Sequence, residues 1–158
     1  MKQTTFLMIK PDGIKHHAEI IDILKQHDLN VEIQNKYKVD INIMRTLLLH
    51  YHEVIDRMGK EFNFVGKMFN SFYFGDFEII PMKVSYEGDE DIIELTRSLA
   101  GATNPEKADK GTLRNMLSHD NYEIADREER LVNNVIHASD SHESAERELH
   151  LWSEYLNA

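Results

Sequence analysis

Near its N-terminus the chain reads Thr5-Phe6-Leu7-Met8-Ile9-Lys10-Pro11-Asp12-Gly13. An apolar run that is stopped by turn-forming residues is typical of a buried β-strand. Lys10 therefore stands at the carboxyl end of the expected strand, where ligands of open α/β folds often bind. Taken alone, the segment favours a tight turn with an exposed lysine over a binding site, and both interpretations stay open.

The rest of the chain shows the same kinds of periodicity. Spacing of apolar residues predicts helices over 18–26, 41–51 and 61–72, and a further helix that begins at the acidic residues 89–91. Alternation or short apolar runs predict strands over 31–39, 80–86 and 133–137, and Asp140 is expected to cap a last helix. Residues 100–115 lack periodicity and are expected to form a functional loop.

The order of these elements predicts the fold class. Without the helices between 41 and 72, the order is β-α-β-β-α-β, the split β-α-β pattern of ferredoxin-like folds. We therefore expect an α+β protein with a four-stranded antiparallel sheet covered by helices. A length of 158 residues suits one domain, here residues 1–158.

Composition excludes several classes of function. The absence of cysteine excludes disulfides, zinc–thiolate sites and cysteine nucleophiles. The 18 basic and 28 acidic residues give a formal net charge of −10, which disfavours a broad nucleic-acid surface but permits a small basic pocket. No apolar run approaches the roughly 20 residues that span a bilayer, and the N-terminus does not resemble a signal peptide. We expect a cytoplasmic protein without a membrane partner.

His137 is the strongest candidate for chemistry among nine histidines. It ends an apolar strand, and Glu148 on the following helix could hold one imidazole nitrogen and leave the other nucleophilic. The alternative, which spacing alone favours, is a structural histidine beside a helix cap. The pairs His16-His17 and His50-x-His52 lack a third ligand at zinc-site spacing, so they are expected to be solvated surface residues.

The segment from 97 to 114 is locally basic within an acidic chain. Its guanidinium groups, ammonium groups and hydroxyls suit phosphate oxygens, although a solvated charged loop is equally compatible with it. The side chains concerned are Arg97, Thr103, Asn104, Lys107, Lys110 and Arg114. The aromatic residues between 62 and 74 are expected to form core or a subunit contact rather than a cofactor site.

Four segments together resemble the nucleoside diphosphate kinase family, and the resemblance extends from about Thr5 to Trp152. The segment from 134 to 146 is the most specific, since it is similar to the active-site signature of the family nearly residue for residue. The four segments are Thr5–Gly13, Gly101–Pro105, Gly111–Arg114 and Asn134-Val135-Ile136-His137-Ala138-Ser139-Asp140-Ser141 with Glu143-Ser144-Ala145-Glu146.

The resemblance implies transfer of the γ-phosphate of a nucleoside triphosphate to a nucleoside diphosphate, by a ping-pong mechanism through a phosphohistidine at His137. Ser139 and Glu148 would support His137, and Tyr51 would lie near the phosphoryl group. The residues implied to hold the phosphates are Lys10, Arg97, Thr103 and Arg114. Lys10 and Asn134 would also reach the sugar hydroxyls, and Phe62, or else Phe64, would stack on the base.

The resemblance also implies the partners. Mg²⁺ would bridge the phosphates without dedicated protein ligands, and the chain would form a homo-oligomer with a dimer as its minimum unit. Two segments depart from the family: Met58-Gly59-Lys60 follows Arg57 where Pro-Phe-Phe is usual, and 117–132 is longer than in short members. These departures keep one alternative open, a nucleotide-binding or sensor module of the same fold without turnover.

Overall fold

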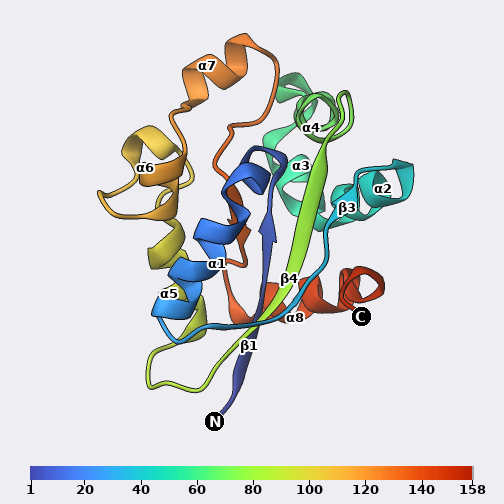
Figure 1. Ribbon diagram of the computed structural model, residues 1–158. Coiled ribbons are helices and arrows are strands. Elements are labelled where there is room, and N and C mark those ends of the chain that lie inside the picture. Colours follow the sequence, from blue (N-terminus) through green and yellow to red (C-terminus); the bar gives the residue numbers. More distant parts are fainter. Residues whose placement is uncertain (158) are drawn as a thin grey trace.

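The structure, a computed structural model, describes residues 1–157 and is built around one antiparallel sheet (Figure 1). The strand order is β2-β4-β1-β5, and a short β3 also pairs with β4. The strands are β1 (Gln3–Ile9), β2 (Asn30–Gln34), β3 (Tyr37–Lys38), β4 (Glu78–Tyr86) and β5 (Ile136–Ala138). The expected α+β, split β-α-β arrangement is confirmed, with one more strand than the four expected.

Helices cover both faces of the sheet (Figure 1). On one face lie α1 (His17–Gln26) and α5 (Ile92–Ala100), and on the other lie α2 (Ile41–His50), α4 (Phe64–Phe72) and α8 (His142–Leu151). The remaining elements are α3 (His52–Met58), α6 (Leu113–Leu117), α7 (Tyr122–Arg127) and four 3₁₀ helices, Pro11–His16, Lys60–Phe62, Pro105–Lys107 and Ser153–Tyr155. Among the described residues, none of the helices has the length and apolar character needed to cross a bilayer.

The central strand β1 explains why its sequence is apolar without alternation. Leu7 and Ile9 pack in the core under α1 and α5, whereas Phe6 and Met8 pack in the core under α2, α4 and α8. Successive side chains of a strand point to opposite faces, so a strand covered on both sides needs apolar residues at every position. The same run therefore contributes to both hydrophobic cores.

The strand expected over 31–39 is interrupted in the structure. Gln34 pairs with Met82 and Tyr37 pairs with Ile79, so the register places Asn35 opposite Pro81 of β4. Proline has no backbone N–H and cannot donate to the ladder. The pairing therefore breaks at this point and resumes two residues later.

Helix starts also differ from the sequence-based expectations. The helix expected from residue 61 begins at Phe64, because Asn63 adopts a left-handed conformation and its side chain accepts from the Gly66 amide. The last helix is capped by Ser141 rather than Asp140, since the Ser141 hydroxyl accepts from the Ser144 amide. The segment 100–115, expected to be a functional loop, also contains the 3₁₀ helix Pro105–Lys107 and the start of α6.

The turn after β1 is joined closely to the residues that precede β5. The amide of Lys10 donates to the Val135 carbonyl at 2.9 Å, and the Val135 amide donates to Asp12 Oδ2 at 2.9 Å. A Cβ atom added at Gly13 would fall inside contact distance of the Val135 carbonyl oxygen, which is backbone. Only glycine allows this approach of the two segments.

Substitution of Gly13 by alanine should therefore lower stability. The added methyl group forces the turn away from Val135, and such overpacking costs about 1–3 kcal/mol of unfolding free energy. Urea unfolding measures the loss. Lys15→Ala changes an exposed residue nearby and serves as the control, with an expected change within about 0.5 kcal/mol. Wild-type stability in Gly13→Ala would contradict the close approach.

Candidate active site

His137 lies on β5, opposite Met8 of β1, and its ring is fixed from one side. Its Nε2 atom is 2.8 Å from Oε1 of Glu148, which projects from α8 and is 4% exposed. The Ser139 hydroxyl donates to the same Oε1 over 2.6 Å and lies 3.1 Å from the Phe6 carbonyl oxygen. Because a carboxylate accepts hydrogen bonds, this arrangement places the imidazole proton on Nε2 and leaves a lone pair on Nδ1.

His50 is a buried neighbour of His137, which corrects the expectation that it is a solvated surface residue. It is 4% exposed, and its ring centroid lies 4.4 Å from that of His137. Burial lowers the pKa of His50 well below its usual value, and the nearby His137 adds to the effect. The signal was present in the sequence, because position 50 continues the buried stripe of Ile43 and Leu47 on α2.

The imidazoles of His50 and His137 and the carboxylate of Glu148 lie close enough to suggest a metal site, since their ligand atoms fall within 4.8 Å of one another. The hydrogen bonds that these three side chains already make do not fit metal binding. Trp152 Nε1 donates to His50 Nδ1 at 3.0 Å, so the proton of neutral His50 is on Nε2 and no lone pair remains there for a metal. Mg²⁺ also prefers oxygen ligands, of which this group offers only a carboxylate that His137 and Ser139 already contact.

Lys10 is buried beside His137 in a chain of polar contacts. Its Nζ atom donates to Asn134 Oδ1 at 2.8 Å, and Asn134 Nδ2 donates to the Thr103 carbonyl at 2.9 Å. Burial lowers the pKa of Lys10 to about 8, an effect that nearby Asp12 partly offsets. The contacts join the end of β1, the 101–105 segment and the residues before β5.

Arg114 is held chiefly by backbone. It donates from Nε to the Asn134 carbonyl at 3.2 Å, from one terminal nitrogen to Gly101 at 2.9 Å and from the other to Ile136 at 2.7 Å. Its burial lowers the pKa to about 10, so the guanidinium remains charged at neutral pH. Arg97 is exposed on α5, and one of its terminal nitrogens donates to the Asp140 carbonyl at 3.2 Å.

These side chains border one cavity of about 700 Å³. Its lining contains every site residue implied by the family resemblance except Ser139, which lies fully buried behind Glu148. Asn104, Lys107 and Lys110 of the basic segment do not line it, and both lysines are exposed. The candidates that line it are Lys10, Tyr51, Phe62, Phe64, Arg97, Thr103, Arg114, Asn134, His137 and Glu148. Burial raises the pKa of Tyr51 above its usual range, which keeps its phenol protonated.

The sequence did not indicate several other residues of the cavity wall. Three arginines and two residues of α7 belong to this set, and they come from four separate segments. They are Arg57, Tyr122, Asp126, Arg130 and Arg147. No spacing rule relates them, because only the tertiary arrangement of α3, α7 and α8 brings them to the cavity.

The expectation for the aromatic residues between 62 and 74 holds only in part. Phe72 belongs to the core, and Phe69, Tyr73 and Phe74 pack on one another at the edge of α4. Phe62 and Phe64 instead line the cavity, where Phe64 packs against Tyr51 with ring centroids 5.6 Å apart.

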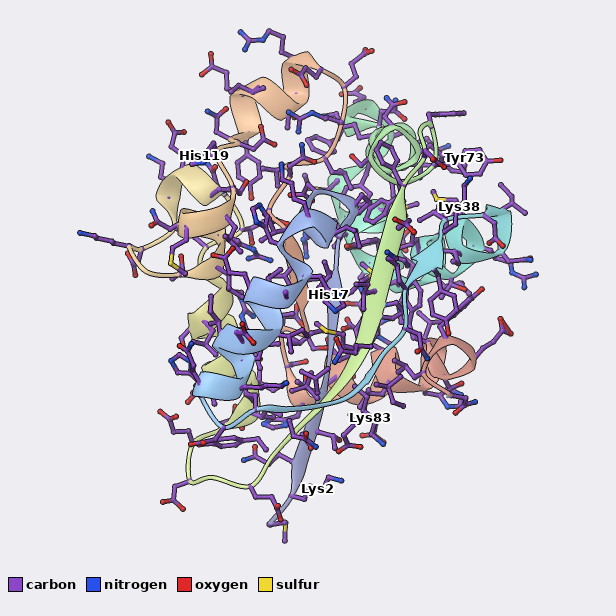
Figure 2. The ribbon with its side chains drawn as sticks, viewed as in Figure 1. Lys2, His17, Lys38, Tyr73, Lys83 and His119 are labelled. Carbon is purple, nitrogen blue, oxygen red and sulfur yellow. The ribbon has the colours of Figure 1, made fainter. Side chains whose placement is uncertain are left out.

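Several lysines outside the cavity are paired with acidic groups. Lys2 and Lys83 contact Glu32, and Lys38 lies 2.7 Å from Asp76, all three on the outer surface (Figure 2). The cavity lining, by contrast, carries more cations than carboxylates, so it is a local positive group in an acidic protein. Such a group suits a phosphate-bearing ligand of small size.

Comparison with known proteins identifies the family. The family model described as nucleoside diphosphate kinase matches residues 3–156. The chain belongs to the nucleoside diphosphate kinase family. A nucleoside diphosphate kinase of Methanosphaera stadtmanae is 34% identical over 156 residues, covering 96% of this chain and 86% of that protein. One of Metallosphaera sedula is 35% identical over 154 residues, covering 95% of this chain and 92% of that protein.

Solved structures agree with this membership. A nucleoside diphosphate kinase of Halobacterium salinarum in complex with CDP has a TM-score of 0.73 and 25% identity, and the match covers 96% of this chain and 88% of that one. The enzyme of Borrelia burgdorferi with bound vanadate and ADP has a TM-score of 0.81 and 24% identity, with 99% and 92% covered. The chain is thus an enzyme of a phosphotransferase family with the fold of its relatives.

The contact between Glu148 and His137 predicts a single imidazole tautomer. In ¹⁵N NMR spectra, Nε2 of His137 should be protonated and Nδ1 unprotonated at a pH where the ring is neutral. Glu148→Ala removes the acceptor, so both nitrogen shifts should move toward the average of two tautomers. His119, exposed on the surface, provides the control, since its shifts should not change. A protonated Nδ1 in the wild-type protein would contradict the assignment.

Proposed function

We propose that this enzyme transfers the γ-phosphate of a nucleoside triphosphate to a nucleoside diphosphate through a phosphohistidine at His137. The observation that carries the proposal is the fixed ring of His137. Glu148 holds Nε2, which leaves Nδ1 free, and His137 lines a cavity whose wall contains several cations. A neutral, oriented imidazole is a competent nucleophile near pH 7.

The reaction consists of two opposite transfers at one site. Nδ1 of His137 attacks the γ-phosphorus, the bond to the β–γ bridging oxygen breaks, and the nucleoside diphosphate leaves with that oxygen. A terminal oxygen of the acceptor diphosphate then attacks the phosphorus, and the P–N bond breaks. The Nε2 proton stays on the ring and is shared with Glu148, which stabilises the positive charge that develops on the imidazole.

Charge neutralisation and positioning supply most of the catalysis in phosphoryl transfer. Lys10, Arg97 and Arg114 are the cations that would contact the phosphates, and Thr103 would add a hydroxyl. Tyr51, kept neutral by burial, would donate its phenolic hydrogen to the transferring group. Mg²⁺ would be supplied with the nucleotide substrate, where it would neutralise phosphate charge, and it would need no site made from protein ligands.

The nucleoside would occupy the outer part of the cavity. Asn134 and Lys10 would reach the sugar hydroxyls, and Phe62 would stack on the base, with Phe64 as the second candidate. Stacking reads no hydrogen-bond pattern, so a broad tolerance for bases follows. The CDP complex of the halobacterial relative, which is 25% identical, supports a nucleotide as the ligand.

Labelling with ATP that carries a radioactive γ-phosphate tests the covalent step. The wild-type enzyme should take up an acid-labile, base-stable label, and a nucleoside diphosphate should remove it. His137→Ala should take up none, because no other nitrogen replaces Nδ1. His142→Ala changes an exposed histidine outside the cavity lining and should label normally. Equal labelling of the wild-type enzyme and His137→Ala would disprove the mechanism, and saturable binding without labelling would favour the sensor alternative.

The lowered pKa of Lys10 predicts a pH dependence of nucleotide binding. The free protein loses the Lys10 proton as pH rises through about 8, and the phosphates then lose a cationic partner. The affinity for ADP should therefore fall about tenfold between pH 7 and pH 9. Calorimetric titration measures this fall. Lys10→Met should bind ADP weakly at pH 7 and lose no further affinity up to pH 9. The same fall of ADP affinity with pH in both proteins would contradict the role of Lys10.

A further inference from the structure

The outer part of the cavity lies between two walls that are far apart in the sequence. One wall is formed by residues of α3 together with Phe62, and the other is the segment 118–132, which contains α7. Both walls meet α4, which lies beside α7 at the end of the molecule opposite the N-terminus (Figure 1). The contacts between α4 and the segment 118–132 therefore determine how the cavity is closed.

Three neighbouring side chains of α4 make these contacts. Lys67 Nζ is 3.0 Å from Asp126 Oδ1, Asn70 Nδ2 donates to the Glu129 carbonyl at 2.6 Å, and Ser71 Oγ accepts from the Leu131 amide at 2.9 Å. Positions 67, 70 and 71 share one face of a helix. Three consecutive parts of the segment are thus attached to a single helical face.

Lys67 has a second contact, on the other wall. Its Nζ atom lies 3.6 Å from the centroid of the Phe62 ring, a cation–π distance. The Lys67 side chain is only 11% exposed, so its ammonium group is largely shielded from competing water. One charge therefore links the Phe62 ring to the Asp126 carboxylate, and it covers one face of that ring.

The segment 118–132 is itself held in a fixed shape. Arg130 donates two hydrogen bonds to the Asp120 carboxylate, at 2.6 and 3.1 Å, and a third to Glu128 at 2.9 Å. The Asn133 amide donates to Asp120 Oδ2 at 2.7 Å. Because these contacts join the two ends of the segment, a displacement of α7 after a change at Lys67 alters the shape of the cavity wall.

We propose that Lys67 positions the base-binding part of the nucleotide pocket, a role that rests on the proposed function. Lys67 fixes the orientation of the Phe62 ring, so that the free face of the ring meets the base, and it holds α7 against the opposite side. Its effect is confined to the nucleoside, because the phosphate-binding candidates come from other elements: Lys10, Arg97, Thr103 and Arg114.

Lys67→Met tests the proposal, because methionine keeps an unbranched apolar side chain and removes the charge. The affinity for ADP should fall about five- to tenfold, whereas the affinity for pyrophosphate, which has no base, should not change. In turnover assays KM for the nucleotide should rise with little change in kcat. Lys60→Met changes an exposed lysine of the same region that does not line the cavity, and it should match the wild-type enzyme.

Two further variants separate this role from a general loss of structure. Lys67→Arg keeps a cation that can contact both the ring and the carboxylate, so it should restore most of the ADP affinity. Asp126→Asn should add little to the effect of Lys67→Met when the two are combined, since both changes disrupt one link. Wild-type ADP affinity in Lys67→Met, or an equal loss for ADP and pyrophosphate, would overturn the proposal.

These binding measurements do not depend on turnover. Suppose that His137 takes up no label but Lys67→Met still lowers the affinity for ADP and leaves the affinity for pyrophosphate unchanged. The phosphohistidine mechanism then fails, and the role of Lys67 stands. If labelling is normal and Lys67→Met changes the affinities for ADP and pyrophosphate equally, the role of Lys67 fails and the mechanism stands.

Discussion

Both backbone groups of Val135 are held by the turn that follows β1. The carbonyl accepts from the Lys10 amide, and the amide donates to Asp12. Val135 has a φ of +63°, which is unfavourable for a β-branched residue and persists only where surrounding contacts impose it. This link determines where β5 begins. The positions of Asn134 and His137, and through His137 the contact with Glu148, depend on it.

The same link explains why residues distant in sequence share one site. The central strand is covered on both faces, so its end is a rigid point at which Lys10 can be buried with its charge. His137 stands one strand away, and α8 returns along the sheet to bring Glu148 behind it. The cations contributed by α5 and α6 complete the wall. An acidic protein can in this way contain a small cationic cavity, because cations from several segments converge on it.

Much of the fold could be predicted from periodicity. The apolar run before Lys10, the alternation from 80 to 86 and the helical spacing in 18–26 each depend on neighbours in the sequence, and each produced an element near its expected place. The gap between β2 and β3 could not be predicted this way, because it depends on which residue faces Pro81. The burial of His50 follows from its place on the buried stripe of α2, whereas its spacing from His52 carries no structural information.

The site was partly predictable for a similar reason. Lys10, His137 and Glu148 lie in or beside segments with recognisable patterns. The wall formed by 118–132 instead depends on contacts between α4 and this segment that no local pattern encodes. The Arg114 contacts to three carbonyl groups are equally invisible in the sequence, because the acceptors are backbone atoms.

Those contacts give Arg114 an unusual evolutionary position. A residue that only binds substrate can change when the substrate changes, and a residue that only joins segments can be replaced by another that joins them. Arg114 connects the 101 turn to the strand that bears His137 while its charge borders the cavity. Lysine has one nitrogen and could not reach all three carbonyls, so selection for folding alone would retain the arginine even in a descendant that had lost catalysis.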